Sequence, residues 1–234
     1  MSEHKSIEQI YDEFMKACVE SNIEKIKLFI SKGVNIHHKE IYFGNNPINI
    51  ACFTGNLEVF KLLLLNGANI NHRNYIQETT IIFASRNNTN IKVIELLILN
   101  GANIHDRDVD GNTSIIIASR YGRIDVVELL LLNGANIHDK NNDGESSIIV
   151  ASKQFYKCHI DVIKLLLSKG ADIYDKIKGE NTSLIQAIRY HNFNGIELLK
   201  RWSLTMFILV LQELFVYHLI DFSSFIDFYE YCYE

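Results

Sequence analysis

One nine-residue phrase, LLLLNGANI, occurs twice in this chain of 234 residues, at 62–70 and at 129–137. Looser copies of the phrase stand at 27–36, 96–104 and 165–173. Their glycines, at positions 33, 67, 101, 134 and 170, are 34, 34, 33 and 36 residues apart. A period in the low thirties is typical of stacked supersecondary units that contact only their neighbours. The spacing therefore predicts a solenoid, and it favours partner binding over catalysis as the first hypothesis.

A second register position, an alanine well ahead of each glycine, indicates six units. These alanines are Ala17, Ala51, Ala84, Ala118, Ala151 and Ala187. Short signals precede the last five alanines, and their first residues have side-chain oxygens suited to cap a helix: Asn46, Thr79, Thr113, Ser146 and Thr182. The only proline, Pro47, follows the first of these, where its missing amide costs little. Each unit is therefore predicted to run from a cap through a helix, a short turn and a second helix to a glycine.

The fourth unit shows this organisation most clearly. Residues 115–118 supply the apolar side of a first helix, and Gly122 interrupts the pattern. Residues 126–131 are almost continuously apolar, so we expect the second helix to be the more buried of the two. Gly134 is placed to end that helix in a left-handed conformation, and the polar stretch 136–144 suits an extended turn or finger. Helices this short are marginal in water by themselves, so neighbouring units must cover their apolar faces.

The repeated order of Asp-x-x-Gly-x-Thr, an alanine, a glycine at the turn and LLLxxGANI resembles the ankyrin repeat over roughly residues 10–200. Residues 108–113 match the start of that pattern fully and residues 141–146 nearly so. The family has Thr-Pro-Leu-His in the first helix, whereas all five copies here lack the histidine. Its place is taken by Ile82, Ile116, Ile149 and Ile185. The bias toward Ile, Asn and Lys further resembles the ankyrin proteins encoded by amoeba-infecting giant viruses.

The resemblance implies an all-α fold, an ankyrin-repeat solenoid of helix-turn-helix units with short β-hairpin or extended fingers. It divides the chain into a divergent N-terminal capping repeat at 1–38, about five further repeats at 39–201 with a divergent last one, and an apolar C-terminal helix or tail at 202–234. It also implies a protein-protein interaction module or scaffold that binds its partner on the concave surface, without catalysis.

Basic residues share one register position, two residues beyond the anchor alanine. Val19, Phe53, Arg86, Arg120, Lys153 and Arg189 stand there in successive units. The resemblance places this end of the first helix near the concave surface, which implies a basic ladder with rungs about 10 Å apart. The adjoining row contains Tyr121 and Tyr190, while acidic residues concentrate in the predicted fingers, at Asp106, Asp108, Asp110, Asp139, Asp143, Asp172 and Asp175.

Two interpretations of the ladder remain open. The rungs could pair with the finger aspartates, each exposed pair contributing under ~1 kcal/mol. Alternatively, the rungs and tyrosines could form a groove for an acidic, extended partner segment. The candidate partner-binding residues are Phe53, Arg86, Arg120, Tyr121, Lys153, Phe155, Tyr156, Arg189 and Tyr190.

Two units carry insertions in the turn between their helices. The third unit gains one residue near 87–90, and the fifth gains three near 155–159. Either solvent simply tolerates longer loops there, or Phe155 and Tyr156 form an exposed aromatic contact point.

Composition and motifs exclude several other classes of function. The formal net charge of -5 gives no reason to expect a nucleic-acid partner. The four cysteines, Cys18, Cys52, Cys158 and Cys232, lack paired or metal-ligand spacing, and no apolar run follows Met1. We therefore expect reduced cysteines and an intracellular, cytoplasmic protein. His105 and His138 repeat in register, but no cysteine or carboxylate set accompanies them at the spacing of a metal site. No motif indicates an enzyme or a cofactor.

The repeat phrase does not return after residue 201, and the chain becomes strongly apolar from Trp202 onward. A helix that caps the last repeat is the first explanation. A membrane anchor is the second, although Glu213 and His218 interrupt the apolar run and argue against membrane contact. The third is a partner-binding tail, comparable in placement to the ubiquitin-ligase adaptor tails of poxviral ankyrin proteins.

Overall fold

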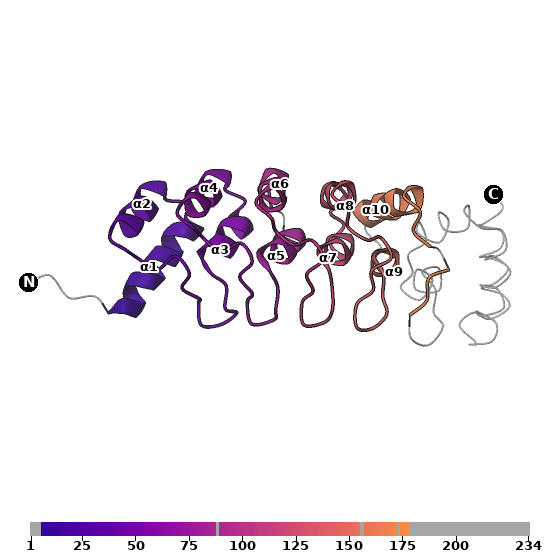
Figure 1. The fold of residues 1–234 in the computed structure, drawn as a ribbon, viewed down its shortest axis with the longest axis horizontal. Coiled ribbons are helices and arrows are strands. Elements are labelled where there is room, and N and C mark those ends of the chain that lie inside the picture. Colours follow the sequence, from indigo (N-terminus) through magenta and orange to yellow (C-terminus); the bar gives the residue numbers. More distant parts are fainter. Residues whose placement is uncertain (1–5, 88, 155–156, 173, 178–234) are drawn as a thin grey trace, which may run out of the picture.

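The computed structural model describes residues 6–87, 89–154, 157–172 and 174–177. Helices and connecting loops make up this part of the chain. In chain order the helices are α1 Ile7–Val19, α2 Ile23–Ser31, α3 Pro47–Thr54, α4 Leu57–Leu65, α5 Thr80–Arg86, α6 Ile91–Leu99, α7 Ser114–Arg120, α8 Ile124–Leu132, α9 Ser147–Ser152 and α10 Lys157–Ser168. Figure 1 shows them in two rows, with long loops extending from one side like fingers. The all-α solenoid expected from the sequence is confirmed.

Each unit pairs one odd-numbered inner helix with one even-numbered outer helix. Helix α7 packs against α5 and α9 in the neighbouring units and against its own partner α8. The connecting fingers are extended: within the described residues they form one isolated β-bridge, between Lys140 and Ser146. Because each unit touches only the next, the core is one continuous layer that runs the length of the solenoid.

The inner helices, not the outer ones, are the more buried. Every residue of α7 from Ser114 to Ser119 is buried. Helix α8 buries Val126, Val127 and Leu130 but leaves Leu132 73% exposed. The expectation from the apolar run at 126–131 was therefore wrong. An inner helix is covered by two neighbouring inner helices and its own outer helix, whereas an outer helix keeps one side open to solvent.

The repeated LLLLNGANI phrase ends each outer helix by local hydrogen bonds. In the third unit Asn100 Nδ2 donates to the Leu96 carbonyl at 2.7 Å, and Gly101 then adopts a φ of +84°. Asn103 Oδ1 accepts from the His105 amide at 3.1 Å and turns the chain into the finger. The same contacts recur in neighbouring units, so the phrase encodes a helix stop and a turn.

The predicted helix caps are only partly confirmed. Asn46 Oδ1 accepts from the Asn49 amide at 3.2 Å. Thr79, Thr113 and Ser146 occupy the N-cap position with extended backbones, but their hydroxyls form no cap hydrogen bond and are buried without a partner among the described residues. In these units the backbone carbonyl of the N-cap residue begins the helix, as in the bond from the Phe83 amide to the Thr79 carbonyl.

The insertion near residues 87–90 is held by both neighbouring units, and so is not a freely solvated loop. Thr89 Oγ1 donates to the Cys52 carbonyl at 2.8 Å, in the unit before it. From the unit after it, Arg123 Nη2 donates to the Thr89 carbonyl at 2.9 Å, and Nη1 donates to the Asn87 carbonyl. In the fifth unit the ring of His159 reaches the Arg120 carbonyl at 2.9 Å. Phe155 and Tyr156 lie outside the described residues.

Candidate partner-binding face

The ends of the inner helices place the predicted ladder in one row along the solenoid. Phe53 and Tyr121 are about half-exposed, at 59% and 47%. The side chains of Arg86, Arg120 and Lys153 are 30%, 32% and 24% exposed. We call these five residues the inner row. The remaining candidates, Phe155, Tyr156, Arg189 and Tyr190, lie outside the described part of the chain, as do residues 202–234.

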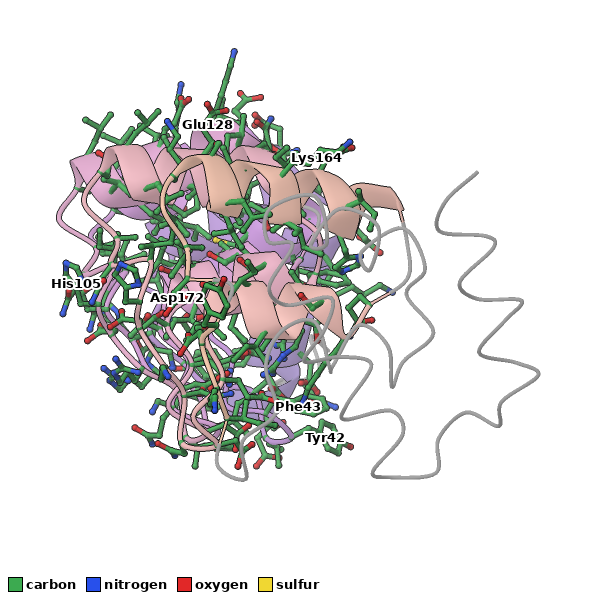
Figure 2. The ribbon with its side chains drawn as sticks, turned by 90° about the vertical axis from the view of Figure 1, so that its right-hand side faces the viewer. Tyr42, Phe43, His105, Glu128, Lys164 and Asp172 are labelled. Atoms are coloured by element: carbon green, nitrogen blue, oxygen red, sulfur yellow. The ribbon has the colours of Figure 1, made fainter. Side chains whose placement is uncertain are left out.

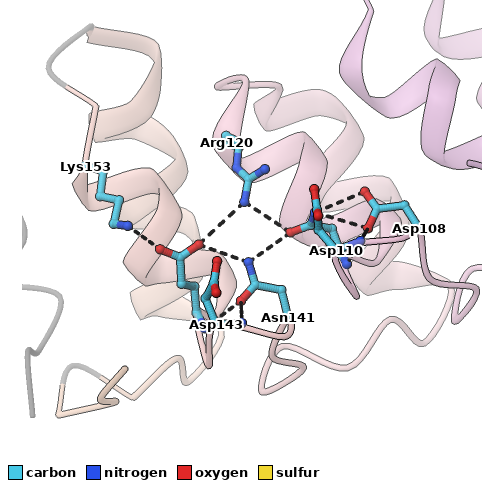
Figure 3. Close-up of polar contacts among 8 residues, drawn as sticks. Asp108, Asp110, Arg120, Asn141, Asp143 and Lys153 are labelled. Carbon is cyan, nitrogen blue, oxygen red and sulfur yellow. Dashed lines mark hydrogen bonds and ion pairs between the residues drawn. The ribbon is translucent and has the colours of Figure 1, made fainter. Parts of the chain in front are cut away.

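The cations of the inner row are paired with glutamates, not with the finger aspartates that the sequence suggested. Arg86 Nη2 lies 3.0 Å from Glu78 Oε2, and Arg120 Nη2 lies 3.5 Å from Glu145 Oε2. Lys153 pairs with the other oxygen of Glu145, so two cations converge on one carboxylate (Figure 3). The cations pair with these glutamates because Glu78 and Glu145 each directly precede the N-cap residue of an inner helix. That position places the carboxylate beside the inner row.

At the tips of four described fingers, an Asn side-chain amide donates a hydrogen bond to a Glu or Asp carboxylate. Which of the two residues comes first in the sequence alternates from one finger to the next. The pairs are Glu40 with Asn45, Asn74 with Glu78, Asp108 with Asn112, and Asn141 with Glu145. At two junctions between units the amides meet. Asn74 Nδ2 donates to Asn45 Oδ1 at 3.3 Å, and Asn141 Nδ2 donates to Asn112 Oδ1 at 3.1 Å.

At the intervening junction, between the third and fourth units, the alternation brings two carboxylates to the same place. Glu78 and Asp108 both line a pocket of about 120 Å³ there. Arg86 and Arg120 form its cationic walls, and Tyr121 lies at its edge. The pocket is large enough for one side chain, and it connects the inner row with the fingertips.

Burial is the largest influence on Glu78, and it raises the pKa of this carboxyl. The charge of Arg86 and the hydrogen bond from Asn74 lower the pKa, whereas the charge of Asp108 raises it again. The pKa of Glu78 therefore lies above its ordinary value of 4.5.

Burial also raises the pKa of Glu145, and it is the largest single influence there. Hydrogen bonds from Lys153 and Asn141 and the charges of Lys153 and Arg120 together outweigh it. The pKa of Glu145 is therefore lowered, so two glutamates in equivalent positions shift in opposite directions.

A second ladder of cations links the fingers, and sequence reasoning missed it. Its members are Lys39, Arg73, Arg107 and Lys140, spaced by 34, 34 and 33 residues. Arg107 Nη1 donates to the Lys140 carbonyl of the next finger at 2.6 Å, while its Nη2 reaches Asp139 at 3.1 Å. Two more finger aspartates pair with this ladder, Asp106 with Arg73 and Asp175 with Lys140. The shared period of the four cations was the signal that could have revealed it.

The sequence matches the family of ankyrin repeats in several overlapping stretches. The family of ankyrin repeats in three copies matches residues 81–177 and 115–203. The family of ankyrin repeats in many copies matches residues 14–64 and 55–98. These matches span most of the chain. The chain belongs to the ankyrin-repeat family. Ankyrin repeats are in general protein-protein interaction modules, and neither matching family is catalytic. No curated protein matches this ankyrin-repeat chain.

The described residues include neither a candidate membrane span nor a candidate metal site. No helix between residues 6 and 177 has the length and apolar character needed to cross a membrane. In the same part of the chain, no group of three or more His, Cys, Asp or Glu side chains is placed to hold a metal ion.

Proposed function

We propose that this ankyrin-repeat protein is an interaction module or scaffold that holds an extended segment of a partner protein along the inner row. The observation that carries the proposal is the set of donors around the pocket between the third and fourth units. Arg86 and Arg120 both line it, and each uses Nη2 for its ion pair. Their Nε and Nη1 groups have no hydrogen-bond or ion-pair partner within the described residues, so they are available as donors to a bound segment.

Aromatic side chains add apolar contact area to the same row. Phe53 stands in the second unit and Tyr121 beside the pocket, and both are about half-exposed. Aromatic and arginine side chains are enriched among the residues that dominate binding energies at protein interfaces. The glutamates hold the two arginines in place before a partner arrives, which lowers the entropy that binding would cost.

An acidic partner segment stays a prediction of the sequence. The ion pairs with Glu78 and Glu145 reduce the positive charge that would attract such a segment. Changing Arg86, Arg120 and Lys153 together to Glu is not a suitable test, because it would leave the two buried carboxylates of Glu78 and Glu145 beside new carboxylates.

The proposal is tested by chemical crosslinking of the full chain in a lysate of the cells in which the protein occurs, followed by mass spectrometry of the crosslinked peptides. We expect partner crosslinks to cluster at the inner row, and we expect Phe53→Ser combined with Tyr121→Ser to remove them. Leu65→Ser combined with Leu99→Ser is the matched control, since both leucines are exposed on outer helices. Loss of crosslinks in the control but not in the inner-row variant would contradict the proposal.

The cell compartment is also part of the proposal. Cys18 and Cys52 are buried as free thiols, and burial raises the pKa of Cys18 to about 12. Thiols of this kind are ordinary in a reducing compartment, which supports a cytoplasmic site of action. A giant-virus source would make that the host cytoplasm; localisation of the tagged full chain in infected cells tests both.

A further inference from the structure

Exposed apolar side chains collect at the tips of the first three fingers. We call this set the fingertip strip, and its members are Ile41, Tyr42, Phe43, Tyr75, Ile76 and Val109. Their exposed fractions range from 41% to 85%. Figure 2 shows Tyr42 and Phe43 at the end of the fingers, far from the outer helices. Single exposed apolar residues are normal, but a contiguous group of this kind marks an interaction site.

Backbone hydrogen bonds make the strip continuous from one finger to the next. The Tyr75 amide donates to the Phe43 carbonyl at 2.9 Å, and the Val109 amide donates to the Ile76 carbonyl at 3.1 Å. The ring of Tyr75 also lies directly on Gly44, where a Cβ atom would come within 2.7 Å of it. The tips are therefore fixed against each other before any partner binds, which favours binding.

The chemistry of the tips changes along the solenoid. Asp110 stands beside Val109 at the third tip, and Asn142 and Asp143 replace the apolar residues at the fourth. Asp110 and Asp143 are exposed, and no cation lies within ion-pair distance of either in the part of the chain that the structure describes. At the third and fourth tips the unpaired charge is therefore negative, and it lies at the end of the fingertip strip.

We propose that the fingertips bind an extended segment of a partner protein that is apolar in one half and basic in the other. The apolar half covers the fingertip strip, and its Lys or Arg side chains lie against Asp110 and Asp143. Tips about 10 Å apart make a row of four about 30 Å long, which an extended chain covers with about nine residues. This inference rests on the proposed function in that the ligand is a protein segment, but it uses the fingertips instead of the inner row.

The test measures binding of a fluorescent synthetic peptide to the full chain by fluorescence anisotropy. The peptide has about nine residues, Leu and Phe in its first half and Lys in its second, and a control peptide has Glu in place of each Lys. We expect the Lys peptide to bind at least about fivefold more tightly than the Glu peptide, and the difference to shrink as salt is raised.

Two variants separate the parts of the surface. Asp110→Asn combined with Asp143→Asn should weaken the Lys peptide about fivefold and abolish its preference over the Glu peptide. Tyr42→Ser combined with Phe43→Ser should weaken both peptides about tenfold or more, because both use the strip. The outer-helix variant Leu65→Ser with Leu99→Ser should bind both peptides like the unaltered chain, and circular dichroism confirms that each variant is folded.

Three results overturn the inference. One is tighter binding of the Glu peptide, another is unchanged binding by both fingertip variants, and the last is no binding of the Lys peptide up to about 1 mM. In each case the proposed function survives if the inner-row variant, Phe53→Ser with Tyr121→Ser, still loses its partner crosslinks. Loss of the fingertip inference is thus distinguishable from loss of the proposed function.

Discussion

Asn49 is buried in inner helix α3, and among the described residues neither of its side-chain polar atoms is hydrogen-bonded. Its exposed fraction is 0%, and both Oδ1 and Nδ2 lack a partner in the part of the chain that the structure describes. The equivalent positions in the next three units hold Ile82, Ile116 and Ile149, all fully buried. We therefore expect Asn49→Ile to stabilise the protein. We expect the same of Asn49→Leu, because the Leu side chain has nearly the shape of Asn.

The magnitude follows from the polar groups that the substitution removes. An unsatisfied buried donor or acceptor costs about 1–3 kcal/mol, and Asn49 has one of each kind. The larger apolar side chain recovers some transfer free energy, while tighter packing opposes it by about 1–3 kcal/mol. The net expectation is a gain of about 2 kcal/mol in the free energy of unfolding. For a chain of this size that corresponds to about 4–8 °C in Tm.

Urea unfolding of the full chain, followed by circular dichroism at 222 nm, measures the effect. The reciprocal change, Ile116→Asn, places the same amide in the same position of a later unit and should cost about 3–5 kcal/mol. The Asn49 backbone amide is bonded to Asn46 and is unaffected by these substitutions. If both apolar variants at position 49 are less stable than the unaltered chain, Asn49 is satisfied by a bound water or a polar contact, and the reasoning fails.

Four further predictions concern the fingers. Glu78→Gln should cost less stability as the pH rises above 4.5, because a raised folded-state pKa adds stability at low pH that is lost as the carboxyl ionises. Glu145→Gln should cost less stability as the pH falls below 4.5, because a lowered folded-state pKa adds stability that protonation removes. Urea unfolding at a series of pH values from acid to neutral measures both costs, and a cost that changes with pH in the same direction for both variants would contradict this pair of predictions. Gln77 has a φ of +61° where Gly44, Gly111 and Gly144 stand in the other fingers, so Gln77→Gly should raise the free energy of unfolding by about 1 kcal/mol, and a lower free energy would show that the Gln77 side chain is needed. Arg107→Met keeps the apolar stem but removes the bonds to the next finger, and should cost about 1 kcal/mol and speed amide hydrogen exchange in residues 139–145; unchanged exchange there would rule out a tie between fingers.

Local contacts explain why the period, the helix pairs and the helix stops could be predicted. The side chain of Asn100 bonds within its own helix, and Gly101 takes its left-handed conformation at the next residue. Such interactions span four residues or fewer, so the sequence contains both partners side by side. The basic register of Arg86, Arg120 and Lys153 was found in the same way, by aligning one unit with the next.

The sequence by itself determined that this is a solenoid of helix pairs, because each unit repeats its own apolar pattern, turn and stop. Only the tertiary structure decided which glutamate neutralises which rung, which helix of a pair is the more buried, and that Asn49 has no partner. Arg120 reaches Glu145 of the next unit, whereas Arg86 and Lys153 each pair with a glutamate eight residues earlier in their own unit. The burial of a helix and the surroundings of Asn49 depend on side chains in adjacent units, roughly thirty residues away. The fingertip strip is of the same kind: its apolar residues are scattered along the chain, and they form one surface because neighbouring fingers hydrogen-bond to each other.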